Sequence, residues 1–411
     1  MKILVISSLF PYPPIQGKAQ VRTFSLLKHL NTNYDITLVT QKSDQVLEED
    51  IDALQQQISH CHIFPGVTRQ ENGKGFLETA KKLGIFVQQG TPPRVLSHYS
   101  QAIQEWVDNA IASGEYDILL CEGSANEIYA RPEWQGKIPM VIDIHRSVYG
   151  IYKQKIETNG NDSGLREQLS LPLLRRYERQ YCDKFASVIV ANQTEQQILK
   201  SLKLDIPITL VPNGLNLEVF PKRPINQSGH RITFVGRMDK PANIDAARFF
   251  SLDVFPKIRQ RYPEATLDIV GNRPVSEVLE LNELSGVNVT GQVPCVLDYL
   301  HNTTVSVIPI RNSIGTKMRT LEALATGTPL VASNYGLEGL PVDSPGQPLV
   351  AMRANDIDEY VYGVGRLFQD EKLREKLSHN GRTLVENKYT WEQMSRRYEQ
   401  VLLNTYDKFI S

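Results

Sequence analysis

Short apolar runs alternate with segments of helical periodicity along most of this chain. Segments such as Val21–Leu30 and Thr194–Leu202 carry apolar residues at three- and four-residue intervals, as amphipathic helices do. Runs such as Ile3–Ile6 and Ile118–Cys121 have the length of buried strands. Because strands that are joined through helices run parallel, the alternation predicts an α/β fold with parallel sheets and helical crossovers.

The alternation occurs in two sets, which predicts two domains. The segment between the sets is polar and holds Pro221, Pro224 and Gly229, so it indicates a linker. A chain of 411 residues also exceeds what one hydrophobic core usually organises. We predict an N-terminal Rossmann-like domain over residues 1–213, a linker over 214–230 and a C-terminal Rossmann-like domain over 231–390. The expected strands are Ile3–Ile6, Ile36–Thr40, Cys61–Phe64, Ile118–Cys121, Met140–Ile142, Val188–Ala191 and Thr209–Val211, then Ile232–Val235, Thr266–Val270, Val287–Thr290, Val305–Ile310, Leu330–Ala332 and Pro348–Ala351.

The end of the chain predicts a helix that returns to the first domain. Trp391, Met394, Tyr398, Val401 and Leu402 fall on one helical stripe. Because such a stripe must be buried, we expect residues 391–411 to pack back on the N-terminal domain.

Composition and charge exclude several classes of protein. The formal charge of -1 gives no global electrostatic argument for nucleic-acid binding. The sequence contains no run of about 18 apolar residues, which is the length that a membrane-spanning helix needs. The apolar start of the chain breaks after Ile6 into a proline-rich stretch, which indicates a strand and not a signal sequence. The cysteines lack the spacing of a zinc site or a disulfide framework. We expect a cytoplasmic protein without a metal ion or a cofactor.

The strongest motif follows the eleventh expected strand, which leads through a polar loop into Gly315 and a helix. The start of that helix would bring unpaired backbone N–H groups together with Thr316, Lys317 and Arg319, a set that suits a phosphate. Glu322 follows one to two turns later, where its carboxylate would bond sugar hydroxyls. The segment therefore predicts a site for a sugar nucleotide.

A second motif follows the first strand of the second domain. Gly236 and Arg237 lie at the carboxyl end of that strand, where ligands of parallel sheets gather, and a helix capped by Asn243 comes next. Arg237 alone could be a surface arginine in a tight turn. Together with Lys317 it predicts two cationic loops that share one anion.

Glycines also follow the next two strands, at Gly271–Asn272 and at Gly291. Glycine after a strand is often a simple turn. Where neighbouring loops hold phosphates, however, such glycines allow main-chain groups to form a narrow slot for a nucleotide base.

In the first domain, Gly17 and His145 are the candidate ligand contacts. Gly17 lies in a proline-rich loop after the first strand, where it would admit a phosphate or sugar close to the backbone. His145 follows the strand that begins at Met140 and would bond a sugar hydroxyl. The alternatives are a rigid structural loop and a histidine that bonds a nearby carbonyl.

The segment Leu171–Lys184 is a charged helix that includes Glu178. A solvated face is the simpler reading of such a helix. Its apolar neighbours, together with the Lys81–Lys82 pair, leave peripheral contact with an anionic membrane at the inner face of the cytoplasmic membrane as the alternative.

In this order the motifs resemble the retaining glycosyltransferases of family 4, whose GT-B architecture has two Rossmann-like domains facing across a cleft. The resemblance covers nearly the whole chain. A Gly-Thr-Lys turn and the segment 335–340 are similar to the branch associated with exopolysaccharide synthesis. The strongest parts are Phe234–Arg237, Ile269–Gly271, Val289–Gly291, Gly315–Ser333, Val211–Gly214 and Tyr389–Trp391.

The resemblance implies that the second domain binds a nucleotide-sugar donor and the first domain an acceptor. Arg237 and Lys317 would hold the diphosphate without a metal ion. Glu322 would bond the ribose, and His145 would lie near the transferred sugar.

Two positions depart from the family pattern. Ile314 stands where the family has the first glutamate of its Glu-x7-Glu motif, and Lys240 follows Arg237 by three residues, not five or six.

We therefore expect a metal-independent, retaining transfer of a hexose from a nucleoside-diphosphate sugar to a hydroxyl acceptor, which is a glycan, a lipid-linked glycan or a small molecule. Two alternatives stay open: a nucleotide-sugar epimerase of the same fold, and a catalytically silent nucleotide-sugar-binding protein, which the residue Ile314 suggests.

Overall fold

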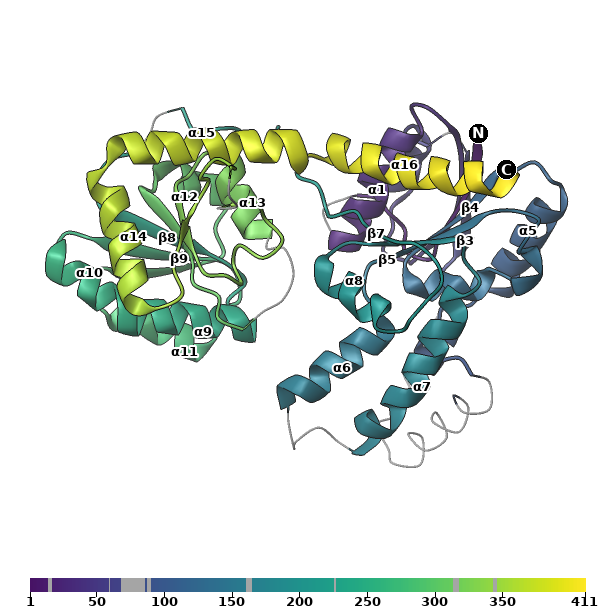
Figure 1. Cartoon of the computed structure of the whole chain (residues 1–411), viewed down its shortest axis with the longest axis horizontal. Coiled ribbons are helices and arrows are strands. Elements are labelled where there is room, and N and C mark those ends of the chain that lie inside the picture. Colours follow the sequence, from purple (N-terminus) through teal and green to yellow (C-terminus); the bar gives the residue numbers. More distant parts are fainter. Residues whose placement is uncertain are drawn as a thin grey trace. The chain divides into compact units, whose positions relative to one another are not determined.

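The computed structural model describes residues 1–13, 17–58, 60–67, 86, 90–159, 165–224, 227–312, 318–342 and 346–411. The chain divides into two compact units (Figure 1). The first unit consists of Met1–Asn213 and Met394–Ser411, and the second of Gly214–Gln393.

The first unit contains a seven-stranded parallel sheet in the order β3-β2-β1-β4-β5-β6-β7. The sheet order reverses between β1 and β4, because the chain builds outward from β1 on one side and from β4 on the other. Almost every residue of β1, β4 and β5 is buried, which explains why these strands are continuous apolar runs without polar alternation. The strands are β1 Lys2–Ser7, β2 Asp35–Lys42, β3 His60–Pro65, β4 Ile118–Glu122, β5 Met140–Ile144, β6 Ser187–Val190 and β7 Ile208–Leu210.

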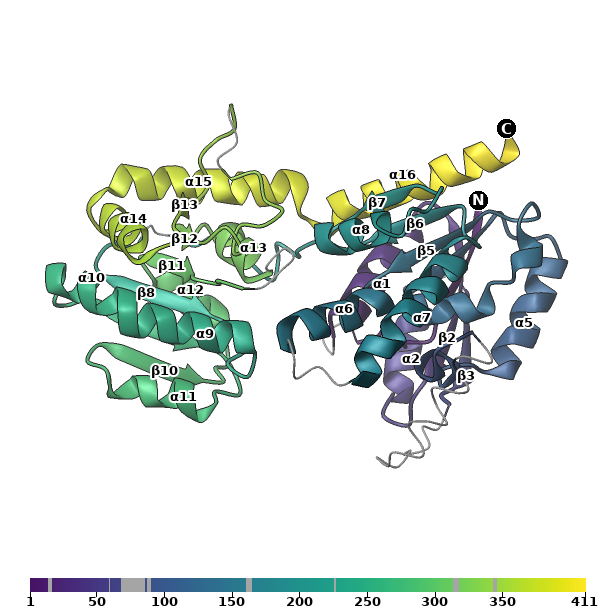
Figure 2. The same ribbon diagram turned by 60° about the horizontal axis from the view of Figure 1, so that its bottom comes forward.

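Helices cover both faces of this sheet (Figures 1 and 2). The predicted return of the chain end is confirmed, because α16 belongs to the first unit from Met394 onward, and Met394, Tyr398 and Leu402 are completely buried there. The helices are α1 Lys18–Leu30, α2 Glu48–Gln55, α4 Pro93–Leu96, α5 Gln101–Ala112, α6 Val148–Asn159, α7 Leu165–Cys182, α8 Gln193–Lys200 and α16 Trp391–Ile410.

The second unit contains a six-stranded parallel sheet in the order β10-β9-β8-β11-β12-β13, which reverses between β8 and β11. The strands are β8 Arg231–Val235, β9 Thr266–Val270, β10 Val287–Gly291, β11 Val305–Ile308, β12 Leu330–Ala332 and β13 Met352–Arg353. The predicted α/β class with two Rossmann-like domains is therefore confirmed.

Two layers of helices enclose the second sheet. Helices α9, α10 and α14 lie on one face, and α12, α13 and α15 lie on the other (Figure 1). The helices are α9 Pro241–Phe249, which continues through a π turn at Phe250–Val254 into α10 Phe255–Arg261, then α11 Ser276–Leu279, α12 Val296–Asn302, α13 Met318–Ala325, α14 Ile357–Gln369 and α15 Glu371–Lys388.

The structure differs from the sequence prediction at the sheet edge and at the linker. The strand expected at Pro348–Ala351 is wrong, because the Val350 N–H donates to the Val342 carbonyl at 3.3 Å and β13 begins only at Met352. The described residues of the expected linker belong to the second unit. Buried Arg223 is an example: its guanidinium donates to the Thr303 carbonyl at 2.9 Å.

Candidate functional site

In the second unit, the loops that follow β8, β9 and β10 lie side by side at the carboxyl edge of the sheet. The Gly236 N–H donates to the Val270 carbonyl at 2.9 Å, and the Gly271 N–H donates to the Gly291 carbonyl at 3.2 Å. The structure therefore brings together the glycines that the sequence singled out. Asn272 joins them through its carbonyl, which accepts the Met238 N–H at 3.0 Å.

Gly271 is a glycine because the two neighbouring backbones touch. Its φ is +155°, and a Cβ at this position would lie 1.6 Å from the Gly236 carbonyl oxygen. No side chain fits into that distance. The contact packs the two main chains directly against each other at this edge, with no side chain between them. Gly291 has a φ of +67° and open space where a Cβ would be.

Asn243 holds this loop and does not cap helix α9 as predicted. The helix begins one turn earlier, with Lys240 as its N-cap and Pro241 as its first residue, because proline is preorganised for that position. The Asn243 Nδ2 donates instead to the Arg237 carbonyl at 2.9 Å. The side chain thus fixes the backbone that carries Arg237.

Arg237 forms an ion pair within its own loop. Its Nε and Nη2 donate to the two carboxylate oxygens of Asp239 at 3.1 and 2.6 Å, and its side chain is 45% exposed. The hydrogen bond from Arg237 holds the pKa of Asp239 below its usual value. Arg273, a non-glycine residue with a φ of +54°, approaches the same carboxylate at 3.8 Å. An incoming phosphate would meet both guanidinium groups and would compete with Asp239.

Two further arginines of this edge are also paired. Arg311, after β11, donates to both oxygens of Asp245 and stacks on the Phe249 ring at 4.5 Å. On α13, Arg319 forms an ion pair with Glu322, whose side chain is only 10% exposed. Ion pairs of arginine with a carboxylate therefore lie on the loops that follow β8 and β11 and on the helices α9 and α13 that come after them, next to the point where the sheet order reverses.

Several predicted residues of this motif lie outside the described part of the chain. These are Gly315, Thr316 and Lys317, together with Ile314 at the position of the family glutamate.

In the first unit, the carboxyl edge of the sheet carries a buried polar network. Glu122 ends β4, Asp143 lies in β5 and His145 follows β5. The His145 Nε2 lies 3.1 Å from the Glu122 Oε2 and 3.8 Å from the Asp143 Oδ2. Both carboxylate side chains are fully buried, whereas the His145 side chain is 20% exposed. The imidazole is therefore the part of the network that a ligand can reach.

Arg22 of α1 supplies the positive charge behind this edge. Its Nε donates to the Asp143 Oδ2 at 2.7 Å, and its Nη1 donates to the Val211 carbonyl at 2.9 Å and to the Asn213 Oδ1 at 3.1 Å. Although burial lowers the pKa of Arg22, the charge of Asp143 outweighs it and the net pKa is raised. Arg22 is thus a charged residue with only 1% exposure, and the carboxylates around it balance its buried charge.

Tyr398 of α16 completes the network from the other end of the chain. Its hydroxyl donates to the Glu122 Oε1, and the Thr23 hydroxyl donates to the Glu122 Oε2 at 3.1 Å. Burial alone would raise the pKa of Glu122, but His145 and Tyr398 together hold it below its usual value. Glu122 is therefore an ionised acceptor of three hydrogen bonds.

Among the described residues, Glu122, Asp143 and His145 bring potential ligand atoms within 4.8 Å of one another. The group does not suit a resident metal ion, because the Arg22 guanidinium and the Tyr398 hydroxyl already occupy carboxylate lone pairs. Arg22 also supplies the balancing charge that a cation would bring.

Two other predicted positions of the first unit have local contacts in the structure, and the ligand contact of Gly17 stays a prediction. Gly17 is the N-cap of α1, with an extended φ of -169° that any residue adopts. Glu178 is fully buried, so the solvated-face prediction is wrong for this residue: it accepts the backbone N–H groups of Val148 and Tyr149 at 3.2 and 3.0 Å and thereby caps α6. Lys81–Lys82 lies outside the described residues. Of the helices that the structure describes, none has the length and hydropathy to cross a bilayer.

Sequence reasoning missed Glu122, Arg22 and Tyr398. Glu122 had a usable signal, because a strand followed by a polar residue and Gly123 is the pattern that identified the other strand exits. Tyr398 was recognised only as part of an apolar stripe, and Arg22 lies within an amphipathic helix, so their polar contacts gave no local signal.

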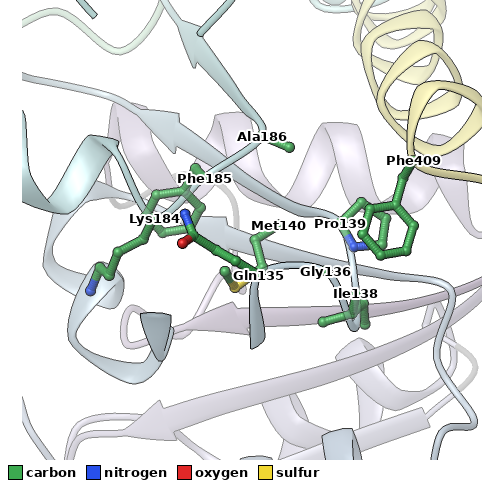
Figure 3. A pocket seen from close by; sticks show the side chains of 9 residues that line it. All are labelled: Gln135, Gly136, Ile138, Pro139, Met140, Lys184, Phe185, Ala186 and Phe409. Atoms are coloured by element: carbon green, nitrogen blue, oxygen red, sulfur yellow. The ribbon is translucent and has the colours of Figure 1, made fainter. Parts of the chain in front are cut away.

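A separate pocket lies at the opposite edge of the first sheet. Met140 and Ala186, at the amino ends of β5 and β6, line it together with Pro139 and Phe409 of α16 (Figure 3). Because ligands of parallel sheets bind at the carboxyl ends of the strands, this pocket is set apart from the network around His145.

Two family models match the chain. The model for "Glycosyltransferase Family 4" matches residues 19–219, and the model for "Glycosyl transferases group 1" matches residues 229–370. Between them they cover most of the chain and meet close to the boundary between the two units.

Curated proteins with similar sequences are also transferases or synthases of sugars. A lipopolysaccharide 1,2-N-acetylglucosaminetransferase from Salmonella typhimurium is 23% identical over 65% of this chain and 74% of its own length. A glycogen synthase from Mycobacterium tuberculosis is 25% identical over 48% of each protein. A phosphatidyl-myo-inositol mannosyltransferase from the same organism is 25% identical over 56% of this chain and 62% of its own length. The chain thus spans about half of the glycogen synthase and less than two thirds of the mannosyltransferase.

Solved structures share the fold over the full chain. The sucrose-phosphate synthase of Thermosynechococcus elongatus aligns with a TM-score of 0.62 and 18% identity over 99% of both chains. The HepE protein of Anabaena in complex with UDP aligns with a TM-score of 0.63 and 12% identity over 98% of this chain and 100% of that chain. The likeness to these structures shows the GT-B fold of two Rossmann-like domains. The two family matches and the transferase relatives show that the chain is a glycosyltransferase of family 4.

Proposed function

We propose that this protein is a retaining hexosyltransferase that moves a hexose from a nucleoside-diphosphate sugar to a hydroxyl of a glycan, a lipid-linked glycan or a small molecule, without a metal ion. The second unit binds the donor, and the first unit binds the acceptor. The names of the relatives support hexose transfer, since they include an N-acetylglucosaminetransferase and a mannosyltransferase.

The observation that carries this proposal is the contact between Gly271 and the Gly236 carbonyl directly beside Arg237. Two closely packed main chains and the exposed guanidinium of Arg237 thus lie together at the carboxyl edge of the second sheet, close to the reversal between β8 and β11. Sheets of this kind bind nucleotides at that point. HepE, which has the same fold, was solved with UDP and with UDP-glucose, and this supports a uridine nucleotide.

Each of these residues has a separate role in the proposed reaction. Arg237 and Lys317 hold the diphosphate and balance the charge that develops on it as the bond from the sugar C1 to the phosphate oxygen breaks. The acceptor oxygen bonds to C1 on the same face, and its proton passes to the departing phosphate oxygen, so that no protein nucleophile is required. Glu322 bonds the ribose, and His145 bonds a hydroxyl of the transferred sugar.

A donor screen followed by product analysis tests the proposal. Thermal unfolding with uridine, guanosine and adenosine diphosphate sugars identifies the donor, because a bound ligand raises apparent stability. With that donor, NMR of the product should show the anomeric configuration of the donor, and chelation of divalent metals should leave the rate unchanged. An inverted product, or loss of the activity with chelator that returns with metal, would refute the corresponding part of the proposal.

Variants test the assigned roles. Arg237→Ala, Lys317→Ala and Glu322→Ala should each lower kcat/KM by about 100-fold, in the range found when one charge-stabilising group is removed. Lys257→Ala is the matched control, because Lys257 pairs with exposed Asp358 at 3.3 Å, outside the strand exits. Normal activity in all three variants would remove these residues from the site.

The same assays separate the two alternatives. An epimerase would change the stereochemistry of the donor sugar in the absence of any acceptor. A silent binding protein would bind the nucleotide sugar and give neither hydrolysis nor transfer with any acceptor.

A further inference from the structure

We propose that Glu122 and Tyr398 are positioning residues for His145, so that the C-terminal helix completes the sugar-facing site of the first unit. This inference rests on the proposed role of His145 toward a sugar hydroxyl. It adds two buried residues that the sequence analysis did not single out as site residues.

The Glu122 carboxylate is oriented from three sides. Tyr398 donates to its Oε1, and Thr23 donates to its Oε2 at 3.1 Å. His145 approaches the same Oε2 through its Nε2, also at 3.1 Å. Because an ionised carboxylate only accepts hydrogen bonds, the His145 Nε2 must carry a proton in this contact. Glu122 therefore fixes both the direction of the imidazole and the position of its proton.

The other ring nitrogen of His145 then faces the ligand side. No hydrogen bond to Nδ1 is found among the described residues. Gly123 lies beside it, and a Cβ built on Gly123 would be 4.0 Å from Nδ1. Since Gly123 has a φ of +92° and no side chain, it leaves room next to Nδ1. In the neutral imidazole this nitrogen accepts a hydrogen bond from a sugar hydroxyl.

Tyr398 connects this arrangement to the end of the chain. The hydrogen bond between Tyr398 and Glu122 spans 276 positions in the sequence, and both side chains are buried. Without the phenol, one oxygen of Glu122 would lose its only described donor, and the carboxylate could rotate away from His145. Helix α16 thus acts on the site through Glu122 and does not need to touch a substrate.

The first test measures the hydrogen bond itself and does not depend on enzyme activity. In protein labelled with ¹⁵N-histidine, the His145 Nε2 proton should give a resolved signal that exchanges slowly with water, and His145→Asn assigns it by its loss. We expect Glu122→Gln to abolish this signal. Tyr398→Phe, which keeps the packed ring, should make the proton exchange at least about ten times faster.

The second test measures catalysis with the donor found by the screen. Glu122→Gln should lower kcat by about 100-fold and Tyr398→Phe by about 10-fold. The Kd for the free nucleoside diphosphate should stay unchanged, because the nucleotide is proposed to bind in the second unit. The matched control is Tyr34→Phe. It removes another phenol hydrogen bond to the same helix, from Tyr34 to Glu399 at 2.7 Å, and does not touch the network.

The outcomes separate this inference from the proposed function. If Tyr398→Phe leaves proton exchange unchanged, or changes it no more than Tyr34→Phe does, the positioning role is wrong. If the proton signal responds as expected and the wild-type protein transfers no sugar, the positioning role holds and the proposed function fails. If the Glu122→Gln protein does not fold, the result for Tyr398→Phe alone decides whether the positioning role is right.

Discussion

Gly271 is the residue whose identity the second unit constrains most tightly. Gly271→Ala would place a Cβ 1.6 Å from the Gly236 carbonyl oxygen, at a φ of +155°. The two loops must separate to admit it. We expect a loss of about 3 kcal/mol or more in the free energy of unfolding and a nucleotide affinity at least about ten times weaker, measured by urea unfolding and calorimetry.

The control for this change is Gly346→Ala in the same unit. Gly346 also has a positive φ, of +78°, but nothing lies within 4 Å of the position of its Cβ. It should cost only about 1 kcal/mol of backbone strain and leave nucleotide binding intact. Equal losses in the two variants would mean that the contact between the loops has no special role.

The ion pair between Arg237 and Asp239 gives a second prediction for a single residue, because in the proposed donor site the carboxylate and a phosphate would compete for the same guanidinium. Asp239→Asn removes the charge that engages both Nε and Nη2 of Arg237. The freed guanidinium should bind nucleoside diphosphate about three to ten times more tightly, with a steeper dependence on salt, measured by calorimetry at two ionic strengths. Asp358→Asn, which breaks the remote pair with Lys257, should change neither quantity. Weaker binding in Asp239→Asn would show that Asp239 orients Arg237 and does not compete for it.

At the scale of elements, the strands were predictable because they are buried on both faces. A continuous apolar run such as Ile118–Cys121 has few interpretations once helical segments flank it. The edge strand β13 was misplaced because its two residues, Met352 and Arg353, are partly exposed and leave no apolar run of their own. The start of α9 was misplaced because Pro241 opens the helix, so that the N-cap is Lys240 and not Asn243.

The glycine exits of the second unit were predictable for a related reason. Parallel strands end at one edge, so residues that follow each strand meet there, as Gly236 and Gly271 do. The network of the first unit could not be found in this way. Its contacts join elements that are far apart in the chain, with 121 positions between Arg22 and Asp143, and no local pattern encodes such pairs.

The start of α6 depends on a buried carboxylate from another helix, which predicts a pH effect. Burial raises the pKa of Glu178 above its usual value near 4.5, although Ser147 and Tyr181 donate hydrogen bonds to it. Protonation of this carboxyl therefore stabilises the folded state. The contribution is complete below the pKa of the unfolded chain and is lost as the pH rises through the folded pKa.

Comparison of Glu178→Gln with the wild type isolates this effect, because glutamine does not titrate. We expect the stability of the wild type relative to Glu178→Gln to fall as the pH rises above the usual carboxyl pKa near 4.5, measured by urea unfolding over a series of pH values. Glu195, which accepts the Ser147 N–H at 2.8 Å, remains in both proteins. The charge of Glu178 contributes to the raised pKa of Glu195, so the measured difference includes this coupling. A difference that stays constant with pH would show that Glu178 titrates normally in the folded protein.

At the scale of the whole molecule, the chain passes between the two units at two places, after Asn213 and after Gln393. The segments on the second-unit side of these crossings are held together: the Leu215 N–H donates to the Tyr389 carbonyl at 2.7 Å, and a Cβ on Gly214 would lie 2.5 Å from the Trp391 nitrogen. On the first-unit side, Asn213 bonds Arg22. Each unit thus holds its own side of the two connecting segments through hydrogen bonds or close packing. Each unit also has its own hydrophobic core.

Separate cores predict that a defect in α16 damages one unit and spares the other. Leu402 is fully buried in the first unit, so Leu402→Asp would bury a charge there and should destabilise that unit by about 4 kcal/mol or more. Thermal unfolding should then show two transitions. Because the donor is proposed to bind in the second unit, nucleotide at about 100 times its dissociation constant should stabilise only the later transition, by about 2.7 kcal/mol. Gln400→Asp, on the exposed face of the same helix, should leave a wild-type profile. A Leu402→Asp protein that folds and no longer binds nucleotide would place donor binding, at least in part, in the first unit.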